Sequence, residues 1–280
     1  MVGVYTFLQI KAPKSWNSAF YGFNSRTHFL FSTITSVVLS RKWFDKIVVF
    51  TDVETWEHLK DFSEIFDEVN FITEKEIPFD IRGTWSVGKM YSYLQMKEPF
   101  VHIDNDVYLK TPMVKIYAEQ YPVIYQSIEI NNYFKGWYQP QFDLVDKYLT
   151  DGFLPHFSKE WNYGELAYNA GVFGGSGIEI IHEVYSKVWD FLLAKKPSED
   201  LSCALEQAYP SMYFYNKGIT PFCVISEKFA GDRQNKEMAR KGYIHLLSDR
   251  KRKNGGQQVI DNCKDFLLTN HFGLYQKIIQ

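Results

Sequence analysis

Two aspartates separated by a single residue follow an apolar run in the stretch FVHIDNDVYL, which spans residues 100–109. Burying a carboxylate is costly unless it is neutralised or paired, so Asp104 and Asp106 either mark the end of a strand or flank a bound cation. Mg²⁺ and Mn²⁺ take oxygen ligands from one or two acids and from substrate phosphates. The spacing suits such a metal–diphosphate site, and it suits a solvated turn equally well.

The segments around this motif alternate between strand and helix patterns. Strands are expected at residues 2–10, 46–52, 68–73, 99–104 and 122–127, and helices at 27–44, 54–66, 84–97 and 111–120. The strands are apolar throughout, which is typical of strands covered on both faces. This order predicts an α/β fold with a mixed, mostly parallel sheet flanked by helices. Ligands bind such sheets at the carboxyl ends of the strands, where Asp104 and Asp106 lie.

The second half of the chain is less regular. Strands are expected at 168–177, 219–226 and 242–248, and helices at 178–196, 199–210 and 259–280, with Pro210 as a helix end and the NGGQQ stretch at 254–258 as a turn. No linker divides the chain. We therefore predict one domain over residues 1–280, with a nucleotide-binding half (1–127) and a half (128–280) that completes the sheet and shapes a second pocket.

Composition limits the possible functions. The net charge of −2 gives no general attraction to nucleic acid or anionic membranes, and no apolar run is long enough to span a bilayer. Three cysteines without CxxC spacing indicate reduced thiols in a cytoplasmic protein. Aromatic residues make up 18% of the chain. One aromatic group suits a sugar-stacking platform and a core equally well: Tyr133, Phe134, Trp137, Tyr138 and Trp161.

With the aspartates placed at a strand end, the chain resembles the GT-A glycosyltransferases that carry an Asp-x-Asp sugar-nucleotide site. It is most similar to the glycogenin/galactosyltransferase-like and capsular-polysaccharide groups. The resemblance rests on four stretches in the expected order: VGKMYSYLQMKEPFVHIDNDVYL, YNAGVFGG, CALEQAY and GYIHLLSDRKR. It implies a Rossmann-like GT-A fold, a Mn²⁺ or Mg²⁺ cofactor and a nucleoside-diphosphate sugar as donor, with a UDP-sugar favoured.

The first stretch supplies the nucleotide and metal residues that the resemblance implies. Lys89 matches a lysine that lies near the donor nucleotide in these families. Asp104 matches the acid that meets the ribose and the metal, and Asp106 matches the direct metal ligand. Taken alone, Lys89 reads equally well as a solvated helix lysine.

Two further stretches match residues around the donor sugar. Asn169, Ala170 and Gly171 match the family's Asn-Ser/Ala-Gly strand, in which the asparagine offers a donor and an acceptor to sugar hydroxyls. Glu206 and Gln207 match an Asp-Gln pair near the reacting carbon, and the longer Glu is a departure from the family pattern. A strand end that needs glycine, and an exposed Glu-Gln on a helix, are the alternative interpretations.

The fourth stretch matches a strand histidine followed six residues later by a lysine. His245 is then the third metal ligand, and Lys251 holds the leaving diphosphate. The usual Pro-Trp after the lysine is missing, so Arg250 or Arg252 is a further candidate for the phosphate. His271, in the string TNHFG, is a second candidate for the metal ligand.

The first two strands are matched less specifically. In this fold the end of the first strand lines the nucleobase pocket, which implies that Tyr5 stacks on the base and Thr6 bonds to it. Asp52, at the end of the second strand, is expected to reach the same pocket.

The resemblance implies a hexosyltransferase-like, retaining glycosyltransferase with an unknown carbohydrate or glycoconjugate acceptor, as in surface polysaccharide or glycoconjugate synthesis. If the reaction inverts the anomeric centre, a general base is needed, and Glu206 is the candidate. The alternatives are a sugar-nucleotide-binding protein without turnover and a nucleotidyltransferase, although residues 9–22 lack the Gly-rich loop expected of the latter. A haloacid dehalogenase-type phosphatase is disfavoured, because Tyr108 replaces the expected Thr or Val.

Overall fold

The computed structural model of the chain describes residues 1–8, 20–77, 86–129, 140–141, 143–144, 148, 167–197, 199–226, 232–246 and 254–280. Its centre is a seven-stranded sheet with the order β3-β2-β1-β4-β7-β6-β8. The bounds are β1 (Val2–Phe7), β2 (Lys46–Thr51), β3 (Glu68–Phe71), β4 (Phe100–Ile103), β6 (Ile124–Glu129), β7 (Ala167–Gly175) and β8 (Phe222–Cys223). Strand β7 runs antiparallel to both neighbours, and the other paired strands are parallel. The predicted mixed, mostly parallel sheet is confirmed.

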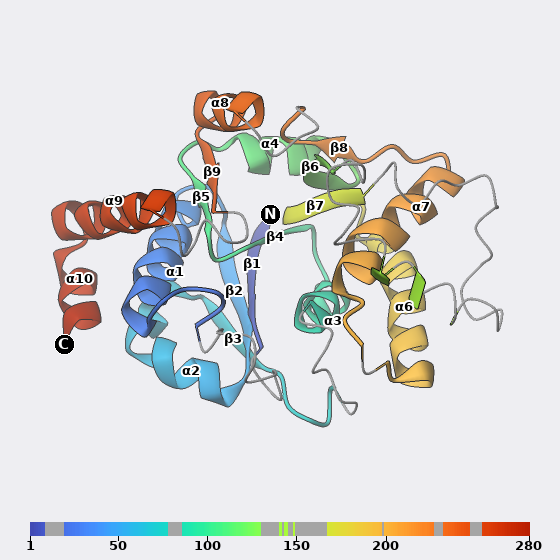
Figure 1. Cartoon of the computed structure of the whole chain (residues 1–280), viewed down its shortest axis with the longest axis horizontal. Coiled ribbons are helices and arrows are strands. Elements are labelled where there is room, and N and C mark those ends of the chain that lie inside the picture. Colours follow the sequence, from blue (N-terminus) through green and yellow to red (C-terminus); the bar gives the residue numbers. More distant parts are fainter. Residues whose placement is uncertain are drawn as a thin grey trace.

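Helices cover both faces of this sheet (Figure 1). The helical segments are α1 (Arg26–Ser40), α2 (Val53–Leu59), η1 (Lys60–Ile65), α3 (Val87–Gln95), α4 (Met113–Gln120), α6 (Ile178–Lys195), η2 (Ala204–Ala208), α7 (Tyr209–Asn216), α8 (Asp232–Arg240), α9 (Asn254–Asn270) and α10 (Phe272–Ile279). One apolar cluster packs α1 and α9 against the sheet, and the other packs α3, α6 and α7. The apolar strand pattern is explained by this two-sided cover.

A second, two-stranded sheet pairs β5 (Val107–Leu109) with β9 (Tyr243–His245) in antiparallel fashion. Strand β5 directly follows the Asp-Asn-Asp turn, and β9 comes from the last part of the chain. Only β9 was expected from the sequence, because the three residues of β5 are too few to show a period. This small sheet places the segment that follows the Asp-Asn-Asp turn beside His245.

Three boundary predictions in the second half are wrong. Pro210 does not end a helix: it lies at the start of α7, where its missing N–H costs little. The NGGQQ stretch is part of α9 rather than a turn. The closing segment 259–280 forms two helices, α9 and α10, separated at His271.

Cys203 and Cys263 are buried, Cys223 is half-buried, and all three are free thiols. Among the helices of the described residues, none combines the length and apolar character needed to cross a bilayer.

The close pairing of β4 and β7 depends on a glycine. Gly174 lies opposite Val101 and has a φ of +152°. A Cβ added there would lie 2.0 Å from the backbone oxygen of Phe100. No side chain fits without moving the central strand β4, which carries the aspartates.

We expect Gly174→Ala to destabilise the protein by at least about 3 kcal/mol, because backbone strain and the clash with a strand carbonyl act together. Urea unfolding measures the change. Gly273→Ala is the matched control, since a Cβ at that position in α10 meets nothing within 4 Å, and it should be neutral or stabilising. Equal stability of Gly174→Ala and wild type would contradict this reading of the β4–β7 contact.

Candidate metal centre

The Asp-Asn-Asp turn lies where β4 leaves the main sheet and β5 begins. The N–H of Val107 donates to the backbone oxygen of Asp104 at 3.0 Å and closes the turn. Asn105 serves the turn, as its backbone oxygen accepts from the Ser32 hydroxyl of α1 at 2.8 Å. The turn is therefore anchored to α1, and both aspartates lie at the carboxyl end of a central strand.

The β5–β9 pairing places His245 beside these aspartates. Val107 lies opposite His245 in the register, and the N–H of Leu246 donates to the backbone oxygen of Asp106 at 3.0 Å. The Nε2 atom of His245 lies 3.5 Å from Oδ1 of Asp106. The histidine is held in place by backbone bonds on both sides of it.

Asp104, Asp106 and His245 together form a possible metal-binding group. One ligand atom from each lies within 4.8 Å of the other two. Asp106 and His245 are buried, whereas the Asp104 side chain keeps 21% of its surface exposed. Two carboxylates and one imidazole are a donor set that suits Mn²⁺ or Mg²⁺, with the open side at Asp104 left for water or substrate oxygens.

Strand β7 borders the site at Gly171. Its backbone oxygen accepts from the N–H of Asp104 at 2.9 Å. A Cβ at this position would lie 2.4 Å from Oε1 of Gln126 and 2.5 Å from Cε1 of His245. Glycine is required here because the side chains of Gln126 and His245 already occupy the space of a Cβ.

Asn169 lies two residues earlier on the same face of β7. Its Oδ1 accepts from the N–H of Gly171 at 2.9 Å, and its Nδ2 donates to Glu129 at 2.6 Å. Within the described part of the chain these are its bonds, which leaves one N–H and one lone pair of the amide for a ligand. Ala170 between them faces the apolar core, so a binding role for its side chain is not supported.

Lys89 on α3 lies between two acids. Its Nζ is 2.7 Å from Oδ1 of Asp104 and 3.2 Å from Oε1 of Glu206. Burial alone lowers the pKa of Lys89, but the charges of Asp104 and Glu206 outweigh burial and raise that pKa above its usual value. The lysine is therefore a charged side chain shared by the turn and the second half of the chain, not a solvated helix lysine.

Glu206 has no exposed surface. It lies in the π-helical turn η2, a distortion that is frequent at functional sites, and the Tyr93 hydroxyl donates to its Oε1 at 3.0 Å. Burial raises the pKa of Glu206 to about 7, against the opposing effect of Lys89. In this position its carboxylate contacts Lys89 and Tyr93, and a role of Glu206 at the reacting carbon stays a prediction.

Gln207, the neighbour of Glu206 in η2, is also buried. Its backbone oxygen accepts from the hydroxyl of Ser211 in the following turn. Glu206 and Gln207, the pair predicted near the reacting carbon, are thus held by η2, and Glu206 of this turn contacts Lys89.

The predicted nucleobase residues lie at the ends of β1 and β2 but have other partners. Tyr5 is fully buried, and its hydroxyl bonds to Ser36 at 2.9 Å and Ser40 at 2.8 Å. A ring in that position cannot stack on a base, so this prediction is corrected. Asp52 is buried and caps α2 by accepting from the N–H of Thr55 at 2.6 Å.

Thr6 differs from these two residues because it is only half-buried. Its hydroxyl donates to Ser92 at 2.9 Å, and His102 Nε2 lies 3.2 Å from the same oxygen. The hydroxyl is positioned between β1, β4 and α3. His102 itself is buried within the sheet, with 1% of its surface exposed.

The structure also distinguishes the two candidate histidines. His245 is in the metal-binding group, whereas His271 precedes α10 and its ring lies 5.5 Å from that of Phe266. Lys251, Arg250, Arg252 and the aromatic platform at 133–138 and 161 lie outside the described residues.

Three contacts of the site were missed by sequence reasoning. Gln126 Oε1 lies 2.6 Å from His245 Nδ1 and also 2.6 Å from the Tyr243 hydroxyl, and Tyr93 bonds to Glu206. A glutamine in the apolar strand segment PVIYQS was the available signal, because a buried polar side chain needs a partner. Tyr93 and Tyr243 gave no such signal, since aromatic residues are common in cores.

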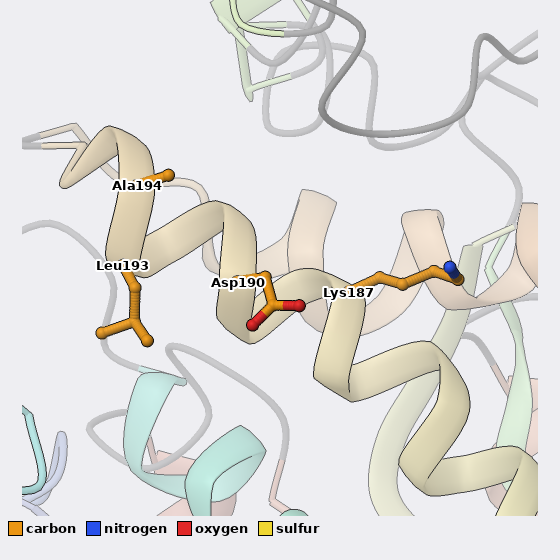
Figure 2. A pocket seen from close by; sticks show the side chains of 4 residues that line it. All are labelled: Lys187, Asp190, Leu193 and Ala194. Atoms are coloured by element: carbon orange, nitrogen blue, oxygen red, sulfur yellow. The ribbon is translucent and has the colours of Figure 1, made fainter.

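A separate hollow lies on the outer face of α6, with a volume of about 490 Å³. Figure 2 shows that Lys187, Asp190, Leu193 and Ala194 border it along the helix. It contains none of the residues discussed above.

Comparison with known proteins adds a family and a fold. The model of one family, described as a family of unknown function (DUF6734), matches residues 1–280. No match was found among curated proteins. The structure of a galactosyltransferase, LgtC, in complex with donor and acceptor sugar analogs superposes with a TM-score of 0.52 at 9% identity, over 96% of each chain.

A second similar structure is the inositol-1-phosphate CTP transferase from T. maritima. It has a TM-score of 0.47 and 10% identity, and the match covers 94% of this chain and 96% of that one. At 9% identity the likeness to LgtC concerns the fold alone, and it confirms the GT-A-like fold class expected from the sequence.

The burial of Glu206 predicts a pH-dependent stability. Its folded-state pKa, about 7, lies above the usual 4.5. Its stabilising contribution is therefore complete below about pH 4.5 and is lost as the pH rises through 7. Relative to Glu206→Gln, which mimics the protonated acid, the wild type should lose on the order of 3 kcal/mol between pH 4.5 and 8.

Urea unfolding of both proteins across this pH range measures the difference. The lysine keeps Asp104 as a partner in the variant, so the fold should persist. Parallel stability curves for the two proteins would show that the carboxylate of Glu206 is ionised at no cost, contrary to its burial.

Proposed function

The chain belongs to the family of unknown function DUF6734, and we propose that this member transfers a sugar from a nucleoside-diphosphate sugar, preferably a UDP-sugar, to an acceptor hydroxyl. The observation that carries the proposal is the convergence of Asp104, Asp106 and His245 at the carboxyl end of the central strand. Ligands bind α/β sheets at this edge. The galactosyltransferase fold supports the same reading at the level of architecture.

The side chains of Asp104, Asp106 and His245 fit a divalent cation better than they fit any neutral ligand. Asp104 and Glu206 both contact Lys89, and Asp106 beside His245 is buried. The space beside Gly171 holds the imidazole of His245 and has no room for an additional atom such as a Cβ. When bound, Mn²⁺ or Mg²⁺ neutralises charge that develops on the leaving diphosphate.

The chain's own side chains bind and orient the donor. Lys89 holds its positive charge beside Asp104, near the proposed position of the donor nucleotide, and Glu206 acts on it as a positioning residue. Asn169, fixed by Gly171 and Glu129, presents its remaining N–H and lone pair to sugar hydroxyls. Thr6 offers a hydroxyl to the nucleotide at the end of β1.

The later part of the chain completes the proposed assignment. Lys251 holds the diphosphate in the families that the chain resembles, and we assign it the same role. Residues 1–127 then supply the nucleotide half, and 128–280 the sugar and acceptor half, of one domain. We propose retention of configuration, because Glu206, the candidate base for inversion, is fully buried.

We expect UDP-sugars to stabilise the wild type against thermal unfolding only when Mn²⁺ is present. A ligand at 100 times its Kd contributes about 2.7 kcal/mol, which corresponds to roughly 5 °C for a chain of this size. Asp106→Asn should abolish the shift, because it removes a charged ligand without changing shape. Asp265→Asn, on an exposed position of α9, should leave it intact.

Thermal unfolding is paired with an assay of donor hydrolysis and transfer, with GDP- and CDP-sugars tested in parallel. Equal Mn²⁺-dependent shifts in wild type and Asp106→Asn would refute the metal site. Stabilisation without hydrolysis or transfer would replace the transferase by a sugar-nucleotide-binding protein, and formation of a sugar nucleotide from nucleoside triphosphate would make it a nucleotidyltransferase.

A further inference from the structure

We propose that Gln126 is a positioning residue that fixes the tautomer of His245, so that the Nε2 lone pair of the imidazole faces Asp104 and Asp106. This inference rests on the proposed metal site. It concerns the residue behind the histidine, which has no role in the sequence motifs.

The contact between the two side chains is short and buried. Gln126 Oε1 lies 2.6 Å from His245 Nδ1, and Gln126 has no exposed surface. The Tyr243 hydroxyl lies 2.6 Å from the same oxygen. A carbonyl oxygen has two lone pairs, and both are used when Nδ1–H and the phenol donate to it.

The direction of the Gln126–His245 hydrogen bond decides which ring nitrogen of His245 keeps its lone pair. A neutral imidazole carries one N–H, and the hydrogen bond made by one ring nitrogen fixes the state of the other. With the proton held on Nδ1 by Gln126, the lone pair lies on Nε2. This is the atom that points toward Asp106 Oδ1, at 3.5 Å, and a metal requires that lone pair.

The surrounding strands leave the glutamine little freedom. The ladder between β6 and β7 shifts its register between Tyr125 and Ser127, so Gln126 lies at an irregularity of the ladder. Gly171 is close to it, since a Cβ there would contact Gln126 Oε1 and His245 at once. The glycine, the glutamine and the histidine therefore form one packed unit.

The tautomer can be read directly in the metal-free protein. We expect ¹⁵N NMR at pH 8 to show His245 with its proton on Nδ1, assigned by the signal that disappears in His245→Gln. In Gln126→Met, which keeps the length of the side chain but loses the strong acceptor, the Nδ1–H state should no longer dominate. In Gln126→Glu and Tyr243→Phe it should persist, because both retain an acceptor for Nδ1–H.

Calorimetric titration with Mn²⁺ alone supplies the second measurement. Loss of a histidine's supporting bond costs about 10–100-fold in metal affinity, so we expect that loss in Gln126→Met and recovery of binding in Gln126→Glu. Tyr243→Phe separates this effect from loosened packing, since it removes the other bond to the same oxygen and should bind Mn²⁺ more tightly than Gln126→Met.

Three results would overturn the inference: an Nε2–H tautomer in the wild type, an unchanged tautomer in Gln126→Met, or wild-type Mn²⁺ affinity in that variant. If Gln126→Met does not fold, the spectra of the wild type and of Gln126→Glu still decide. Failure of the wild type to bind Mn²⁺ would refute the proposed function instead, and the tautomer of the metal-free protein would still test the role of Gln126.

Discussion

The burial of negative charge is the constraint on which the site depends. Asp106 and Glu206 are almost wholly removed from solvent, and a buried carboxylate needs compensating partners. Lys89 compensates one side of the cluster by contacting Asp104 and Glu206, and Tyr93 contributes a hydroxyl. On the other side of the cluster, Oδ1 of Asp106 lies 3.5 Å from Nε2 of His245.

The arrangement of the strands explains why these groups can meet. Parallel strands β1 and β4 deliver their ends to one edge of the sheet, whereas antiparallel β7 enters that edge from the opposite direction. Gly171 and Asn169 therefore lie near the aspartates on a neighbouring strand of the sheet rather than on a loop. Sites built on strands in this way are held more rigidly than sites built on loops.

Much of this was predictable from the sequence, and the exceptions have physical causes. The apolar run before Asp104 and the β-α alternation predicted the sheet and the edge at which the turn lies. Tyr5 was misplaced because alternation along a strand does not tell which face meets a helix and which meets a ligand. The contacts of Gln126 and Tyr93 depend on tertiary packing, and strand β5 was too short to carry a periodic signal.

The pairing of β5 with β9 also has a consequence for the order of events during synthesis. The aspartates emerge from the ribosome with the first half of the chain, and His245 emerges only with its last part. A nascent chain therefore holds an incomplete set of ligands and a weak hold on ions until the C-terminal strand docks. A cation bound at the proposed site would add its free energy to the assembled form alone, and it would thereby stabilise the contact between the turn at residues 104–106 and β9.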